Sequence, residues 1–140
     1  MATRILIADD YEDNRELLRL ILVAAEYEVL EAHDGQECLK LAQDHVPDLI
    51  MVDLSMPKLD GWEVFQAIKA DQRTSNIPFV VVSGYTELDS NRLREAGFNA
   101  YLTKPFRTGE VLETVASLLS GLLPKASVAE AGSSAVTKPA

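Results

Sequence analysis

Five side chains that could take part in a reaction come directly after apolar stretches of the sequence: Asp9, Asp10, Asp53, Ser83 and Lys104. If the apolar stretches are parallel strands, their carboxyl ends lie along one edge of a sheet, where open α/β folds bind their ligands. Carboxylates brought together at such an edge repel one another, and either a shared proton or a bound cation relieves the repulsion. Oxygen ligands that leave room for water and phosphate oxygens favour Mg²⁺.

Phosphoryl transfer is the chemistry that this set of side chains suits. A carboxylate such as Asp53 can act as a nucleophile and form an aspartyl phosphate. The transfer depends mainly on positioning and charge neutralisation. Lys104 would pair with one phosphoryl oxygen, and Ser83 would donate a hydrogen bond to another. Zinc is not expected because His and Cys, its usual ligands, do not occur at the strand ends; His33 and His45 are predicted to lie at the surface.

Each of these residues also has a simpler interpretation. Asp9 and Asp10 could cap the first helix. Asp53 and Ser83 could belong to turns, and Lys104 could be solvated. The chemical interpretation rests on their joint placement, because chance would scatter such residues over both ends of the strands.

The apolar stretches themselves have the composition of buried strands. Residues 4–8, 48–52 and 78–82 are rich in Ile, Val and Leu and show no polar alternation. This composition is typical of strands buried on both faces of a parallel sheet. Residues 27–32 and 99–103 carry more polar side chains, and we predict that they form edge strands.

Apolar residues recur at helical spacing between the strands, at residues 17–25, 38–42, 64–68 and 111–122. A weaker pattern over residues 87–96 indicates a further helix. Five strand–helix units predict an α/β fold with helices on both faces of a doubly wound parallel sheet. The strand order 2-1-3-4-5 would place the two polar strands at the edges and the reversal of strand order between strands one and three.

Two of the predicted helices begin with a capping pattern, in which Asp is followed three residues later by Glu. The pairs are Asp34 with Glu37 and Asp60 with Glu63. The Asp carboxylate can accept the free amides of the first helical turn, and the Glu suits the positive end of the helix dipole. Gly97 is expected to close the weak helix before it.

The composition limits the classes of function. The chain has 140 residues and a net charge of −9, with 13 basic against 22 acidic residues, a charge balance that argues against direct binding to nucleic acid. The single cysteine, Cys38, cannot form an internal disulfide and fits a reducing compartment. The sequence has no signal-peptide layout and no apolar run of the ~20 residues that a membrane helix needs, so we expect a cytoplasmic protein. Residues 1–123 are predicted to form one domain, followed by a disordered Ala- and Ser-rich tail at 124–140.

The ordered set of motifs resembles the receiver domains of response regulators in two-component signalling, and the resemblance covers about residues 3–123. Any one mark is weak, but the set at these spacings is highly specific. The marks are Asp9-Asp10, Asn14, Asp53, Met56-Pro57, Asp60-Gly61, Ser83, Ala100-Tyr101 and Lys104-Pro105. The resemblance points to a single-domain, flavodoxin-like receiver.

The resemblance implies a role for each site residue. Asp53 would be the phosphoacceptor, with Asp9, Asp10 and the main-chain carbonyl of Ser55 completing a Mg²⁺ site. Lys104 and Ser83 would contact the phosphoryl group. The peptide bond between Lys104 and the proline after it would be cis. The phosphoryl donor would be a histidine kinase or a histidine phosphotransfer protein, and the domain would catalyse only its own phosphorylation and dephosphorylation.

The resemblance also implies a conformational switch. On phosphorylation the Ser83 hydroxyl would move towards the phosphoryl group, and the ring of Tyr101 would turn inward. The face formed by the fourth helix, fifth strand and fifth helix would then change shape and alter binding to a downstream protein. Such a switch is a shift between two packings, biased by a new dianion.

Three alternatives compete with this interpretation. A hydrolase with an aspartyl-phosphate intermediate would need a second acid two residues after its nucleophile, where this chain has Ser55. A flavin- or nucleotide-binding module would need a phosphate loop rich in Gly or Ser/Thr after the first strand, where this chain has acidic residues. A receiver-like module that binds proteins without being phosphorylated is disfavoured by the complete set of acidic, hydroxyl and lysine residues.

Overall fold

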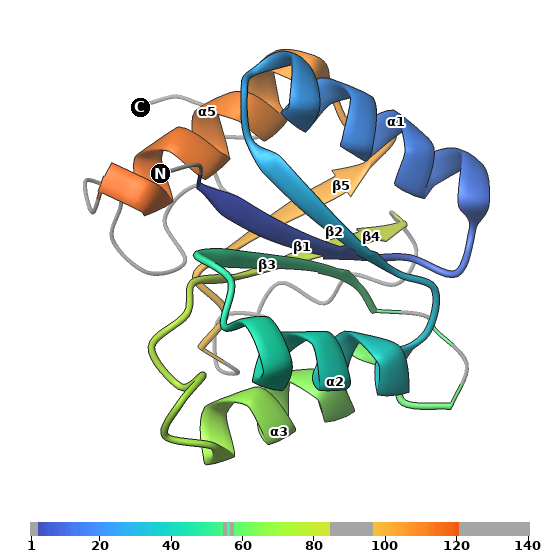
Figure 1. Ribbon diagram of the computed structural model, residues 1–140. Coiled ribbons are helices and arrows are strands. Elements are labelled where there is room, and N and C mark those ends of the chain that lie inside the picture. Colours follow the sequence, from blue (N-terminus) through green and yellow to red (C-terminus); the bar gives the residue numbers. More distant parts are fainter. Residues whose placement is uncertain (1–2, 55, 57, 85–96, 121–140) are drawn as a thin grey trace.

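The computed structural model describes residues 3–54, 56, 58–84 and 97–120, which form a parallel sheet flanked by helices (Figure 1). The strands lie in the order β2-β1-β3-β4-β5, and every neighbouring pair is parallel. The predicted fold class and strand order are therefore confirmed. The elements are β1 (Arg4–Ala8), α1 (Glu12–Ala24), β2 (Glu28–Ala32), α2 (Gly35–His45), β3 (Leu49–Asp53), α3 (Gly61–Ala70), β4 (Phe79–Gly84), β5 (Ala100–Lys104) and α5 (Thr108–Ser120).

The strand ends differ slightly from those predicted. Strands β3, β4 and β5 each start one residue later than expected and run further towards the carboxyl edge. Asp53 and Lys104 are consequently the last residues of their strands, and Ser83 lies inside β4. Because the main chains of these three residues belong to paired strands, their side chains project from a rigid backbone and not from loops.

Alternating residues of the strands face two separate layers of helices. In β1, Leu6 and Ala8 pack with α2 and α3, whereas Ile5 and Ile7 pack with α1 and α5. Figure 1 shows the same arrangement, with α1 and α5 over one face of the sheet and α2 and α3 over the other. Apolar burial on both faces explains why the three central strands lack polar alternation. Strand β2 lies at one edge and keeps exposed positions, as its sequence predicts.

The predicted capping patterns are present at α2 and α3. Asp34 accepts a hydrogen bond from the main-chain N–H of Glu37 at 2.8 Å. At α3 the capping box is complete: Asp60 accepts from the Glu63 N–H at 2.9 Å, and the Glu63 carboxylate accepts from the Asp60 N–H at 3.0 Å. These bonds satisfy amides that would otherwise lack partners at the helix starts. Helix α1 differs, because its N-cap residue Tyr11 makes no side-chain capping bond.

A cluster of aromatic rings fixes α3 to the sheet. Phe65 lies edge-on to Phe79 of β4 and to Phe98, with ring centroids 5.0 and 4.5 Å apart. Trp62 packs against Phe98 at 5.1 Å. Offset and edge-to-face contacts of this kind each add ~1 kcal/mol to the burial of the rings.

Some predictions fall on residues that the structure does not describe, namely the helix at 87–96 and the tail at 124–140. Gly97 has a φ of 89°, the left-handed conformation expected of a residue that closes a helix. Both histidines are exposed, as predicted. None of the described helices is both long and apolar enough to cross a membrane.

Candidate functional site

The strand ends bring the predicted side chains together at the carboxyl edge of the sheet. The Lys104 ammonium donates a hydrogen bond to Asp53 Oδ2 at 2.7 Å and lies 3.3 Å from Asp9 Oδ2. Both carboxylates are almost fully buried, and the side chain of Lys104 is only 22% exposed. The cation thus partly neutralises two carboxylates that burial would otherwise disfavour in their charged forms.

Electrostatics at this edge also act on Lys104 itself. Burial by itself lowers the pKa of the Lys104 ammonium, but the hydrogen bond that it donates to Asp53 and the charges of Asp53 and Asp9 outweigh burial and raise the pKa above its ordinary value. The ammonium therefore stays charged throughout the neutral range. A permanent cation beside a carboxylate can pair with an anionic group that arrives at the site.

The acidic residues have the arrangement of a cation site. One oxygen from each of Asp9, Asp10 and Asp53 can be chosen so that all three lie within 4.8 Å of one another. Asp9 Oδ2 is buried and makes no hydrogen bond among the described residues, although Lys104 lies near it. A buried carboxylate oxygen without a hydrogen bond is costly unless a further partner is bound. The all-oxygen donor set and this oxygen both fit Mg²⁺, which keeps several waters and takes one or two carboxylates.

Hydrogen bonds determine which oxygen of Asp9 faces the site. Asp9 Oδ1 accepts the main-chain N–H of Tyr11 at 2.9 Å, leaving Oδ2 to face Lys104. The alternative in which Asp9 and Asp10 cap α1 is wrong for Asp9, since its bond goes to the N-cap residue and not to the first helical turn. Asp10 is exposed at the rim of the site.

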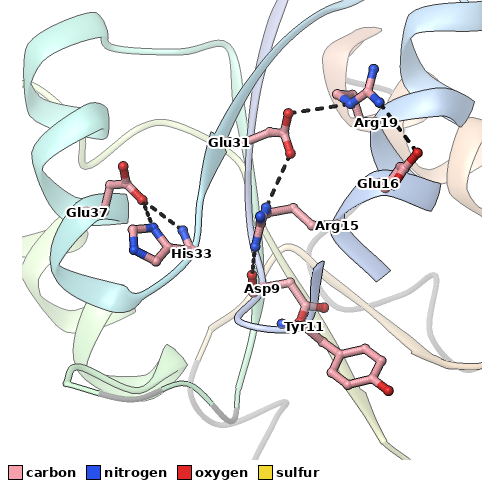
Figure 2. Close-up of polar contacts among 8 residues, drawn as sticks. All are labelled: Asp9, Tyr11, Arg15, Glu16, Arg19, Glu31, His33 and Glu37. Carbon is pink, nitrogen blue, oxygen red and sulfur yellow. Dashed lines mark hydrogen bonds and ion pairs between the residues drawn. The ribbon is translucent and has the colours of Figure 1, made fainter. Parts of the chain in front are cut away.

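One residue at the site was not predicted from the sequence. The Arg15 guanidinium donates to the main-chain carbonyl of Asp9 at 2.8 Å and to Glu31 of β2 at 3.2 Å. Figure 2 shows Arg15 lying between these two partners, with Arg19 on the other side of Glu31. A single Arg in a helix pattern is normally solvated, so its residue type alone does not indicate a site. The one sequence feature that could have pointed to Arg15 is its position directly after Asn14 of the receiver-like pattern.

Ser83 and Tyr101 share one face of the sheet. Val81 pairs with Tyr101 and Ser83 with Thr103 in the parallel register of β4 and β5. Because side chains two residues apart point to the same side, Ser83 and Tyr101 lie on the face that also carries Val81. Ser83 is fully buried, and Tyr101 is partly buried against the cluster beneath α2 and α3.

The loop after Asp53 is held by close backbone packing. A Cβ on Gly61 would lie 2.7 Å from Leu54 Cα and 2.9 Å from the main-chain oxygen of Asp53, so this position accepts only glycine without a shift. On the other side of the loop, Lys58 lies 3.4 Å from the Asp34 carboxylate. Ser55, the expected source of a carbonyl ligand, lies outside the described residues.

The peptide bond between Lys104 and Pro105 is cis, as expected from the receiver-like motif. It directly follows the residue that pairs with Asp53, at the point where β5 ends.

Comparison with known proteins identifies the family. The family model for the response regulator receiver domain matches residues 5–116. The chain belongs to the response regulator receiver family. Among curated relatives of this receiver, the polar-differentiation response regulator DivK of Brucella ovis is 35% identical over 120 residues, which cover 85% of this chain and 98% of that protein.

Solved structures place the receiver in the same fold. The chemotaxis response regulator CheY4 of Vibrio cholerae has a TM-score of 0.77 and 29% identity, over 84% of this chain and 99% of that one. A putative response regulator from Chloroflexus aurantiacus has a TM-score of 0.80 and 30% identity, over 86% and 99% of the two chains.

Proposed function

We propose that this receiver accepts a phosphoryl group on Asp53 from a phosphohistidine, in a reaction that depends on Mg²⁺. The donor would be a histidine kinase or a histidine phosphotransfer protein. The observation that carries the proposal is the joint geometry of Asp53: its Oδ2 lies 2.7 Å from the Lys104 ammonium, and its carboxylate lies within reach of Asp9 and Asp10. In this arrangement the proposed nucleophile would lie between the Lys104 ammonium and the proposed cation site.

The metal site we propose consists of the carboxylates of Asp9, Asp10 and Asp53 and the main-chain carbonyl of Ser55. The buried Asp9 Oδ2, which makes no hydrogen bond to any residue that the structure describes, supports this assignment. When bound, Mg²⁺ would neutralise charge that develops on the phosphoryl oxygens. Two of the three carboxylates are already paired with Lys104, so binding must compete with or rearrange these contacts.

The chemical step requires little from the protein beyond placement. An Asp53 oxygen forms a bond to phosphorus while the P–N bond of the donor phosphohistidine breaks. The imidazole nitrogen leaves with the electron pair and takes up a proton from solvent. Lys104 then exchanges its bond to the carboxylate for one to a phosphoryl oxygen, and the Ser83 hydroxyl donates to another. Positioning of this kind accounts for most of the catalysis in phosphoryl transfer.

The product would act as a signal and not as the intermediate of a multiple-turnover enzyme. We propose that the new dianion moves Ser83, that Tyr101 turns inward, and that the surface around β5 and α5 binds a downstream protein differently. The shared face of Ser83 and Tyr101 in the β4–β5 register supports this coupling. With a net charge of −9, the receiver is expected to pass its signal to a protein and not to nucleic acid.

A phosphorylation assay tests the proposal. The protein would be incubated with Mg²⁺ and acetyl phosphate and its intact mass measured, with Asp53→Asn and a chelated sample as controls. We expect one phosphate adduct on the wild type and none in either control. Absence of the adduct from a folded wild type would contradict the proposal and favour a binding module that is not phosphorylated.

The switch has its own test. In the phosphorylated protein the ring resonances of Tyr101 should shift, and Ser83→Ala should abolish that shift while the adduct still forms. A Tyr101 shift that is unchanged in Ser83→Ala would contradict the coupling without affecting the phosphoacceptor assignment.

A further inference from the structure

Arg15 bridges the loop of the acidic site to the edge strand β2. Its Nη1 donates to the main-chain oxygen of Asp9 at 2.8 Å, and its Nε donates to Glu31 Oε1 at 3.2 Å (Figure 2). We propose that Arg15 is a positioning residue for the cation site, and that the Arg15–Glu31 pair holds Asp9 in the orientation that binds Mg²⁺. The inference rests on the proposed function, because it concerns the same site.

Among the described residues every polar group of Asp9 except Oδ2 makes a hydrogen bond, and Oδ2 lies 3.3 Å from the Lys104 ammonium. Its N–H donates to the carbonyl of Ala32 at 3.2 Å, its carbonyl accepts from Arg15, and its Oδ1 accepts from the N–H of Tyr11. The remaining group is Oδ2, which is buried and faces the site. The main-chain and Oδ1 bonds therefore define the direction of Oδ2, and Arg15 is the one side chain among these partners.

The strand register explains why Glu31 is a suitable anchor. Ile7 pairs with Glu31, and Ala8 pairs with Ala32, immediately before Asp9. Glu31 is thus fixed beside the end of β1, and Arg15 reaches from the first turns of α1 to both the strand and the loop. The guanidinium suits this task because its planar fork presents several donors in fixed directions. Arg15 is also the more protected of the two arginines on Glu31, with a side chain 17% exposed against 36% for Arg19.

Arg19 provides a matched control. It lies on the same helix, and its Nε is 3.5 Å from the other oxygen of Glu31. It also contacts Glu16 but has no contact with Asp9 among the interactions of the described residues. Arg15→Gln and Arg19→Gln change the net charge equally, and they differ in the bond to the Asp9 carbonyl.

The change in Mg²⁺ affinity that we expect on replacing Arg15 is opposite in direction to the change expected from the lost charge alone. Removing a positive charge near an acidic site strengthens its attraction for a cation, so Coulomb energy alone predicts tighter Mg²⁺ binding. Loss of a positioning contact predicts weaker binding, since residues that orient metal ligands typically contribute about 10- to 100-fold in affinity. The direction of the change therefore separates the two explanations.

The experiment is a Mg²⁺ titration followed by amide chemical shifts, which also report whether each variant is folded. We expect the Kd to rise about 10-fold in Arg15→Gln and to stay close to the wild-type value in Arg19→Gln. Arg15→Lys retains the charge but loses the planar guanidinium, whose Nε and Nη1 reach the two partners in fixed directions. It should therefore also weaken Mg²⁺ binding, and it replaces Arg15→Gln in the titration if that variant does not fold.

Two results would overturn the inference, and they are distinguishable. A wild type that binds Mg²⁺, with both Arg15 variants binding as tightly or more tightly, would overturn the positioning role alone. A folded wild type that does not bind Mg²⁺ would overturn the proposed cation site and the inference with it.

Discussion

The Lys104 ammonium donates a 2.7 Å hydrogen bond to Asp53 Oδ2, although the two residues are 51 positions apart in the sequence. The contact exists because β3 and β5 both end at the carboxyl edge, on either side of β4. It links the proposed nucleophile, Asp53, to a cation in a largely buried setting, and the same ammonium also lies near Asp9. The stability of the fold and the chemistry of the site therefore depend on the same few atoms.

Replacing Lys104 should lower the free energy of unfolding, and Mg²⁺ should restore part of that loss. Lys104→Ala leaves the carboxylates of Asp9 and Asp53 buried without their cation. Such losses cost about 3–5 kcal/mol at fully buried sites, and we expect about 2 kcal/mol here because part of the lysine side chain is exposed. Added Mg²⁺ should recover part of the loss in urea unfolding experiments, since it neutralises the same carboxylates.

The pH dependence and a control variant make this prediction specific. The folded-state pKa of Lys104 is raised, so its contribution is complete below the ordinary value of 10.5 and is lost only as the pH rises through the raised value. The difference between wild type and Lys104→Ala should therefore be constant from pH 6 to 9. Lys40→Ala removes an exposed ion pair with Asp44, and its small effect should not depend on Mg²⁺. Equal responses of the two variants to Mg²⁺ would contradict the prediction.

Glycine is required at the start of α3. In Gly61→Ala the new Cβ would meet the main chain of Leu54 and Asp53 at 2.7 and 2.9 Å, and neither group can move away easily. We expect a loss of about 2 kcal/mol in the free energy of unfolding. In Gly109→Ala of α5 the Cβ meets nothing within 4 Å, so this helical position should gain ~0.5 kcal/mol. Urea denaturation measures both values, and a Gly61→Ala protein as stable as wild type would show that the loop is not tightly packed.

The cap of α2 should contribute to the acid dependence of stability. The bond from the Glu37 N–H, aided by Lys58, lowers the pKa of the Asp34 carboxyl below its ordinary value of 3.8. A lowered folded-state pKa gives stability that is present above the ordinary value and is lost as the pH falls through the lowered one. Asp34→Asn keeps a capping oxygen but cannot ionise.

We therefore expect the wild type to exceed Asp34→Asn by about 0.5 kcal/mol near pH 7, with the difference disappearing below the lowered pKa. Other carboxyls titrate in both proteins, so the difference isolates Asp34. The measurement is the urea midpoint from pH 7 to 3. A difference that stays constant over this range would contradict the assigned cause.

Much of the fold and of the site was predictable because it rests on local signals. The continuous apolar runs identified the central strands, and the Asp60–Glu63 pattern identified the start of α3. The strand ends also indicated that Asp9, Asp53 and Lys104 would converge, since parallel strands align their carboxyl ends. Even so, the predicted ends of several strands differ by one or two residues from those observed, because the boundary of a strand depends on pairing with its neighbours.

Contacts that depend on tertiary geometry were not predictable. Arg15 looks like an ordinary helix-surface residue, and only the β1–β2 register reveals that Glu31 lies beside the Asp9 loop. The orientation of Asp9 similarly depends on a main-chain amide, that of Tyr11, which has no sequence signature. The restriction on Gly61 arises from a close approach to the backbone of the preceding loop.

The central claim is that the phosphoryl group resides on the carboxylate of Asp53. The most direct measurement is borohydride reduction of the phosphorylated protein followed by peptide sequencing by mass spectrometry, because borohydride reduces an acyl phosphate, but not a free carboxylate, to an alcohol. We predict homoserine at position 53, dependent on both phosphodonor and Mg²⁺. Homoserine at another aspartate, or an adduct that persists with residue 53 unchanged, would contradict the account.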